Sequence, residues 1–277
     1  MRIDVKKTYK LFIGGAFPRS ESGRSYEIKN KRGEFIANPA QASRKDLRDA
    51  VLSAKSAHPG WSNATAFNRG QILYRIAEML ESRSSQFVDE IVATTGVTPS
   101  VAKQEVATAI DLWVWYAGWC DKITSVSGNN NPIAGPYYNF TIPESLGVIG
   151  IIAEERDSLI GLVRGLAPVI AGGNTSVLIA SQSRPLAAIT FAEVLATSDL
   201  PAGVVNILTG IKTELAPWLA SHMEVDGLDL SGIDDIAELR KSGAENLKRI
   251  HTFKKEVSPE RILAFMEFKT IWHPIGI

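Results

Sequence analysis

The sequence has a single cysteine, Cys120, so no disulfide within the chain and no cysteine-based metal cluster is possible. This scarcity is typical of a reducing compartment, and we expect a cytoplasmic protein. Cys120 lies in an aromatic segment without an obvious cationic neighbour, which indicates a structural thiol rather than a nucleophile. The histidines are also few, and no two have the four-residue spacing of a helical metal site. They are His58, His222, His251 and His273.

The sequence also has no excess of positive or negative charge, because 30 lysines and arginines balance 30 aspartates and glutamates. A neutral chain disfavours nucleic-acid partners and a polybasic membrane anchor, both of which need a basic surface. The longest apolar stretch, Leu159–Ala180, is interrupted by Arg164 and a glycine pair, so no membrane span is expected. Met1–Lys7 has no apolar core, so no secretory signal is expected either.

The sequence has neither a G-x-G-x-x-G motif nor a P-loop, the glycine-rich loops that hold nucleotide phosphates. Two turns where phosphates could bind are acidic instead: Glu154-Glu155-Arg156-Asp157 has three acids, and Ser231–Asp235 has two. Like charges within ~4 Å cost about 1 to 4 kcal/mol, which disfavours a pyrophosphate there. We interpret these acids as N-caps of the helices that follow, with Arg156 paired to an acidic neighbour.

The first third of the sequence is predicted to be helical. Ser43, with Asp46 three residues later, resembles a capping box. Apolar residues within Ile72–Leu80 recur with helical spacing. Thr98-Pro99 is an N-cap followed by proline, and the helix that it begins is predicted to run to about Cys120 with a buried aromatic end.

The middle of the chain predicts a projecting β-hairpin. Residues 127–132, Ser-Gly-Asn-Asn-Asn-Pro, form a turn between the β-prone segments Ile123–Val126 and Tyr137–Ile142. The tail Phe265–Trp272 alternates as one more strand, and Pro274 ends it.

From Gly147 onward, short apolar strands alternate with helices, which predicts a parallel sheet covered on both faces. The expected fold class is α/β, a Rossmann-like doubly wound sheet that binds ligands outside the carboxyl ends of its strands. The expected strands are Val148–Ala153, Ser176–Ala180, Val204–Leu208, Leu228–Leu230 and Lys248–Thr252. The expected helices are Ser158–Ala171, Pro185–Ala196, Thr213–Ser221 and Asp234–Ala244.

Several of these segments resemble the aldehyde dehydrogenase superfamily, across nearly the whole chain. The strongest likenesses are Gly147–Ile152, Leu166–Leu178 and Leu200–Gly210 of the nucleotide domain. Weaker ones are Lys10–Gly15, Asn38–Ala40, Val225-Asp226, Asn246–Arg249 and Phe265–Trp272, the last resembling the family's oligomerisation strand. The resemblance implies an N-terminal helical segment, an NAD-binding domain and a β-flap.

The departures from the family pattern imply lost chemistry. The family's Pro-Trp-Asn, with its oxyanion asparagine, reads Glu154-Glu155-Arg156 here. In the glycine turn only Gly232 matches, so we expect it to be a vestigial cofactor position. The segment with the nucleophilic cysteine is missing between Phe253 and the terminal strand, and Cys120 lies in the wrong domain to replace it. The other departures are Ile179 for the ribose lysine, Gln182 for its partner glutamate, Ile233 and Ala237 in the glycine turn, and Phe253 for the general base.

This pattern looks most like the degenerate second domain of the two-domain (family 16) aldehyde dehydrogenases. It implies a Rossmann-like domain over 1–121 and 144–260, and a flap over 122–143 and 261–277. The exposed edge of that flap would be a template for association, unless Lys122, Lys269 and Pro274 protect it. The expected interface residues are Tyr137, Tyr138, Phe140, Phe268, Ile271 and Trp272.

The leading hypothesis is a non-catalytic assembly partner, without bound NAD, that docks on a second copy or on a catalytic aldehyde dehydrogenase. One alternative is an NAD-binding half that completes an aldehyde oxidoreductase in trans. Another is a small-molecule sensor that uses the vestigial nucleotide cleft, where Arg156 could pair with an anion.

Overall fold

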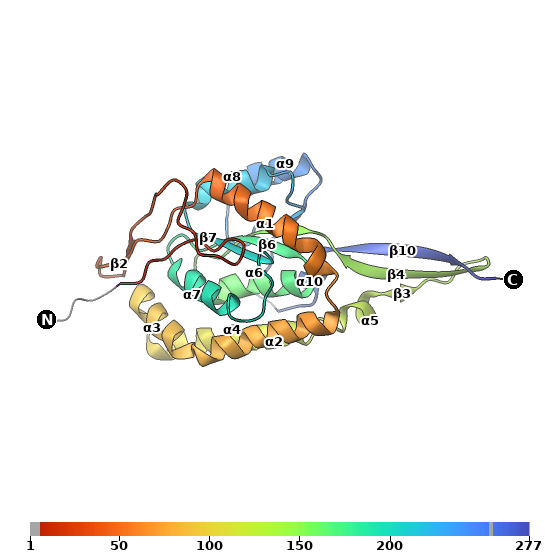
Figure 1. Ribbon diagram of the computed structural model, residues 1–277, viewed down its shortest axis with the longest axis horizontal. Coiled ribbons are helices and arrows are strands. Elements are labelled where there is room, and N and C mark those ends of the chain that lie inside the picture. The colour runs from red at the N-terminus through yellow and green to blue at the C-terminus, as the bar shows by residue number, and fades with distance from the viewer. Residues whose placement is uncertain (1–5, 255–256, 277) are drawn as a thin grey trace.

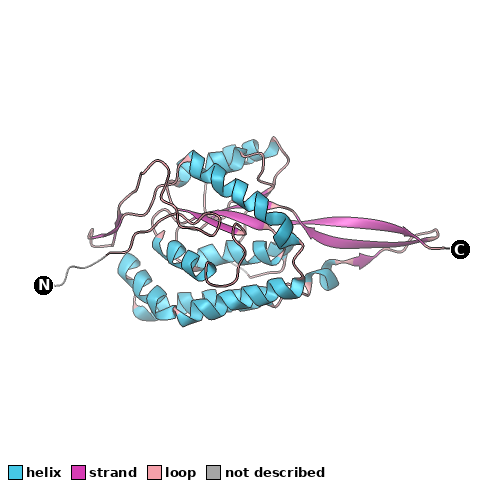
Figure 2. Ribbon diagram, in the orientation of Figure 1, coloured by secondary structure: helices cyan, strands magenta, loops and turns pink. Residues whose placement is uncertain are grey.

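A five-stranded parallel sheet forms the centre of the protein, whose computed structural model describes residues 6–254 and 257–276. The strand order is β7-β6-β5-β8-β9, which confirms the doubly wound prediction (Figures 1 and 2). Strands β5 and β6, which are flanked on both sides, are fully buried, as in a sheet covered on both faces. They are β5 (Val148–Ile152), β6 (Thr175–Ile179), β7 (Val205–Leu208), β8 (Gly227–Asp229) and β9 (Arg249–His251).

Helices cover both faces of this sheet (Figure 1). On one face lie α1 (Arg44–Ser62), α8 (Lys212–Ser221) and α9 (Ala237–Ala244). On the other lie α6 (Ile160–Ala171) and α7 (Leu186–Leu195), which are apolar nearly all round because a further helical layer covers them. That outer layer consists of α2 (Ala66–Ser82), α3 (Ser84–Thr95) and α4 (Pro99–Ala117). In the described part of the chain, no helix is both long and apolar enough to cross a bilayer.

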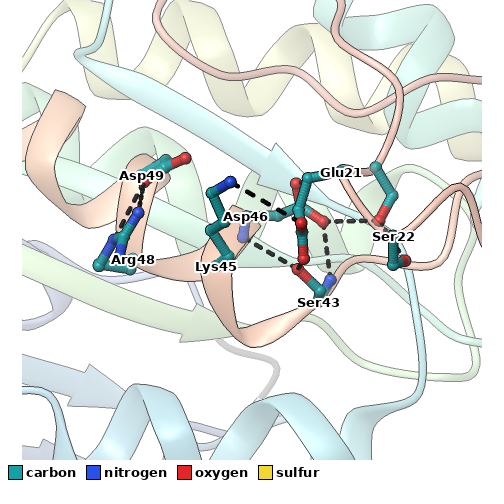
Figure 3. A network of polar contacts seen from close by, with 8 residues as sticks. Glu21, Ser22, Ser43, Lys45, Asp46, Arg48 and Asp49 are labelled. Atoms are coloured by element: carbon teal, nitrogen blue, oxygen red, sulfur yellow. Dashed lines mark hydrogen bonds and ion pairs between the residues drawn. The ribbon is translucent and has the colours of Figure 1, made fainter.

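Hydrogen bonds confirm the predicted helix starts at Ser43 and Thr98. Ser43 Oγ accepts from the Asp46 N–H, and the Asp46 carboxylate accepts from the Ser43 N–H (Figure 3). Glu21 and Ser20 extend this network from the preceding segment, where each bonds to Ser43 or Asp46. Thr98 Oγ1 likewise accepts from the Val101 N–H at the start of α4. These bonds satisfy amide groups that a helix leaves unpaired at its first turn.

A long three-stranded antiparallel sheet projects from the body (Figure 1). It consists of β3 (Asn129–Asn130), β4 (Tyr137–Ser145) and β10 (Met266–Pro274), in the order β10-β4-β3, and we call it the flap sheet. β10 pairs with β4 along its whole length, from Met266 opposite Ser145 to Pro274 opposite Tyr137. The minor elements are β1 (Ile28–Lys29), β2 (Phe35–Ala37), α5 (Ile123–Ser127) and α10 (Glu260–Leu263).

The prediction of a strand at Ile123–Val126 is wrong, because this segment forms the short helix α5. α4 ends at Ala117, earlier than predicted, but its hydrogen bonding continues through a turn in which the Ile123 N–H donates to Trp119 O. Burial of Ile123 under the core then outweighs the β-propensity of its branched neighbours. On the side of β4 opposite β10, the paired strand is instead β3, which lies within the segment predicted to be a turn.

The flap sheet is attached to the body at Phe265, which is 1% exposed and lies beside His251 and Phe253. Its carbonyl accepts from the Asn174 side chain at 2.9 Å, and Arg249 pairs with Glu267 at 2.8 Å. The start of β10 is therefore fixed by packing, a hydrogen bond and an ion pair together.

We predict that Phe265→Ala lowers the free energy of unfolding by about 3–5 kcal/mol, because it leaves a cavity at this junction. Phe268→Ala is the matched control, since Phe268 is 48% exposed on β10, and it should cost less than about 1 kcal/mol. Urea unfolding of both variants checks the difference. Equal losses would mean that Phe265 is not the anchor.

Candidate functional site

The carboxyl ends of the parallel strands meet at one edge, and a buried lysine occupies its centre. Lys212 Nζ lies 2.5 Å from the Glu155 carboxylate. It also donates to the carbonyl oxygens of Gly232, at 3.1 Å, and of Ala153. The Lys212 side chain is only 7% exposed, so these partners replace its hydration shell. One cation therefore joins the ends of β5 and β8 to the start of α8.

Glu155 is bound from a second direction by the turn after β6. Its carboxylate accepts from the N–H groups of Gln182 and Ser183 and from the hydroxyls of Ser181 and Ser183, at 2.7–3.1 Å. Burial favours the neutral acid, but the hydrogen bonds from Lys212, Gln182 and Ser183 outweigh it and lower the pKa of Glu155 to about 2. Glu155 is therefore a fixed negative charge at this edge.

The two positions that the resemblance assigns to ribose-binding residues are a buried isoleucine and a glutamine on the wall of a cavity at this edge. Ile179 is fully buried in β6 and cannot reach the edge. The Gln182 side chain accepts from the Lys212 N–H at 3.2 Å. A shallow cavity of about 610 Å³ remains above these residues. Its walls include Tyr26, Lys29, Glu155, Gly232 and Asp234.

Gly232 is required by packing at this edge. A Cβ atom there would lie 2.1 Å from the carbonyl oxygen of Ala153, so no larger residue fits without moving the backbone. The Gly232 carbonyl also accepts a hydrogen bond from the Lys212 ammonium. These two contacts account for a glycine at this position, and a role in cofactor binding stays a prediction.

The interpretation of the acidic turns as N-caps is wrong. α6 begins without a cap of its own, and Glu105 of α4 instead accepts from the N–H groups of Ser158 and Leu159 at 2.7–2.8 Å. Asp157 pairs with Arg164 at 3.1 Å. α9 also begins without a side-chain cap. A cap supplied by a residue 53 positions away cannot be inferred from local spacing.

Arg156 does not form the predicted pair with its neighbours. It is exposed, and it is absent from the ion pairs formed by the residues that the structure describes. Its carbonyl accepts from Arg184. The acids on either side are engaged by Arg164 and Lys212 instead, which leaves the Arg156 guanidinium at the surface.

Phe253 occupies the position that the resemblance assigns to the family's general base, and the charged side chain of Arg261 lies over its ring. Phe253 packs against His251 and lies under the guanidinium of Arg261, 4.5 Å from its ring centre. Arg261, which is 4% exposed, faces the buried Asp229 at 3.7 Å. Burial raises the pKa of Asp229, while Ser231 and Arg261 favour its charged form. Sequence reasoning missed this pair, because the partners are 32 positions apart in unremarkable segments.

Cys120 is a buried thiol, in agreement with the sequence interpretation. Its Sγ lies 3.6 Å from the Tyr116 carbonyl, and burial raises its pKa to about 12. A thiol with such a pKa is a poor nucleophile at neutral pH. No group of three His, Cys, Asp or Glu side chains within residues 6–254 and 257–276 could hold a metal ion.

The predicted interface residues gather on the flap sheet, on both of its faces. The β4–β10 register places Tyr137, Phe268 and Trp272 on one face. Tyr138, Phe140 and Ile271 lie on the other, with Phe140 and Ile271 half-buried. Trp272 is 59% exposed and meets Tyr137 edge to face. Among the described residues, β10 pairs only with β4, so its outer edge is open there.

The aldehyde dehydrogenase family model matches residues 17–252. Among curated proteins, the cytosolic 10-formyltetrahydrofolate dehydrogenase of Pongo abelii is 32% identical over 256 residues, which cover 89% of this chain and 28% of that protein. The putative aldehyde dehydrogenase DhaS of Bacillus subtilis is 29% identical over 251 residues, covering 89% and 50%.

Solved structures give the same result. A putative aldehyde dehydrogenase from Burkholderia cenocepacia superposes with a TM-score of 0.84 at 28% identity. An aldehyde dehydrogenase from Bacillus cereus, in complex with NAD+, superposes with a TM-score of 0.83 at 25% identity. Both matches cover 88% of this chain and 50% of the other. The chain thus spans half, or less, of the length of these relatives.

The ion pair between Glu155 and Lys212 predicts an acid-sensitive stability. The pKa of Glu155 is lower in the folded protein than its ordinary 4.5, so the stabilisation is present above about pH 4.5. It is lost as the pH falls towards 2. We expect Glu155→Gln to flatten the decline of unfolding free energy between pH 5 and 2.5, as measured by urea titration. Glu154→Gln, which leaves the ion pair intact, is the control and should decline like the unmodified protein.

Proposed function

Because the chain belongs to the aldehyde dehydrogenase family, we propose that it is a non-catalytic member that acts as an assembly partner. It docks through the flap sheet, either on a second copy of itself or on a catalytic aldehyde dehydrogenase. The observation that carries this proposal is a projecting sheet with exposed aromatic side chains and an open edge at β10. Such an edge pairs readily with another strand.

The connection between β9 and β10 supports a non-catalytic role. Residues 252–265 join these strands directly, and the described part of this connection contains only the one-turn helix α10. It is too short for a domain that could present a thiolate at the sheet edge. Phe253 has no proton to exchange, and Cys120 is buried elsewhere. The likeness to the degenerate second domain of the family 16 enzymes stays a prediction that agrees with this view.

The proposal includes the loss of NAD binding. A pyrophosphate at this edge would approach Glu155, whose carboxylate is held ionised, and Asp234 on the wall of the same cavity. The buried cation on the wall of this cavity, Lys212, already has three oxygen partners. The residues present therefore do not fit the cofactor. We keep the cytoplasm as the proposed compartment, because the one cysteine is a buried free thiol.

We predict self-association that depends on the flap sheet. Size exclusion with light scattering should give a dimer or larger assembly, and Trp272→Asp should weaken association at least tenfold by placing a charge in the contact. Phe35→Asp is the matched control, because Phe35 is 42% exposed on β2, at the opposite end of the molecule from the flap sheet (Figure 1). A monomer that also ignores a co-expressed catalytic aldehyde dehydrogenase would refute the assembly role.

Calorimetric titration with NAD separates this proposal from an NAD-binding half that works in trans. We expect no saturable heat up to millimolar NAD, whereas a full-length aldehyde dehydrogenase measured in parallel should bind. Micromolar binding by this chain would favour the alternative.

A further inference from the structure

A second cavity lies at the base of the flap sheet, away from the edge described above. It occupies about 350 Å³ and is lined by residues from the end of α1, the start of α2, α5 and the flap sheet. This volume lies at the lower end of the range for small-ligand pockets. The walls are largely polar, and include His58, Asn63, Arg69, Thr124 and Ser145. Cys120, Gly172 and Met266 complete them on the side of the core.

Arg69 gives this pocket a positive charge without a carboxylate partner. Its guanidinium donates to the carbonyls of Ser62, at 3.3 Å, and Ala64, at 2.5 Å. Its Nε–H is buried and finds no acceptor among the described residues. The one carboxylate on the pocket wall, Glu144, pairs with Lys269 at 3.3 Å. A half-buried guanidinium with only carbonyl partners retains its full charge, which an anion would compensate.

Apart from Glu144, which is paired with Lys269, the other walls supply neutral groups. His58 Nε2 lies 3.0 Å from Ser145 Oγ, and burial lowers the pKa of His58, so the ring is neutral at pH 7. Burial keeps the Cys120 thiol protonated. The pocket thus combines one fixed cation with hydroxyl, amide and imidazole groups. This set suits an oxygen anion, because an arginine fork binds two oxygens and neutral donors bind the others.

We propose that this pocket binds a small oxyanion, an organic carboxylate or inorganic phosphate, through Arg69 and the polar groups around it. The proposal is independent of assembly through the flap sheet. The pocket is bounded by His58 on α1, Ser145 on β4 and Met266 on β10. A bound anion would therefore connect the body to the flap sheet and hold them at one angle.

Calorimetry and thermal unfolding of the full chain test the proposal, with sodium phosphate and sodium acetate as probes at constant ionic strength. We expect saturable binding of at least one probe and a rise in melting temperature with its concentration. Sodium chloride is the control for general salt effects. Each probe is titrated up to about 50 mM, which corresponds to very weak binding. The proposal is overturned if neither probe shows saturable binding in this range.

Matched variants place the binding in this pocket. Thr124→Asp adds a carboxylate to the wall and should weaken binding at least tenfold, whereas the uncharged Thr124→Asn should not. Arg69→Met should also abolish binding, and Arg75→Met, at an exposed position of the same helix, is its control. Since Arg69→Met could destabilise the end of α1, the Thr124 pair decides. Equal binding by Thr124→Asp and Thr124→Asn would refute the assignment.

Discussion

The ammonium group of Lys212 is the constraint on which the carboxyl edge of the sheet depends. It draws together Glu155 and the carbonyls of Ala153 and Gly232, and through Glu155 it also fixes the turn after β6. Breaking a buried pair by removing one partner leaves an uncompensated charge and typically costs about 3–5 kcal/mol. Glu155 is partly exposed, so the cost here is smaller, but the geometry of the edge still follows from this one cation.

Protein carboxylates also occupy amide groups at this edge. Rossmann-like sheets bind phosphates with free amide groups at a helix start. Here the amides of the turn at Gln182 and Ser183 bind Glu155, and those at the start of α6 bind Glu105. Protein carboxylates thus occupy donors that could otherwise hold a ligand's oxygens. This occupancy supports the proposal that the chain does not bind NAD at this edge.

Much of the fold could be predicted from the sequence because its signals are local. The alternation of short apolar strands with helices predicted the doubly wound sheet, and Ser43 with Asp46 predicted the start of α1. The helix α5 could not be predicted, since the burial of Ile123 decides it. The partners at the site were missed for a related reason. Glu155 and Lys212 are 57 positions apart, and only the completed sheet brings them together.

The pairing of β4 with β10 has a consequence for how the chain reaches this structure. Their partners are separated by roughly 120 to 140 positions, with the whole parallel sheet between them. Such distant contacts are costly in loop entropy and form slowly. As the chain leaves the ribosome, β4 is synthesised long before β10, and until then it lacks the strand with which it forms most of its pairs. Its aromatic residues are then exposed in a nascent protein, where chaperones would be most needed.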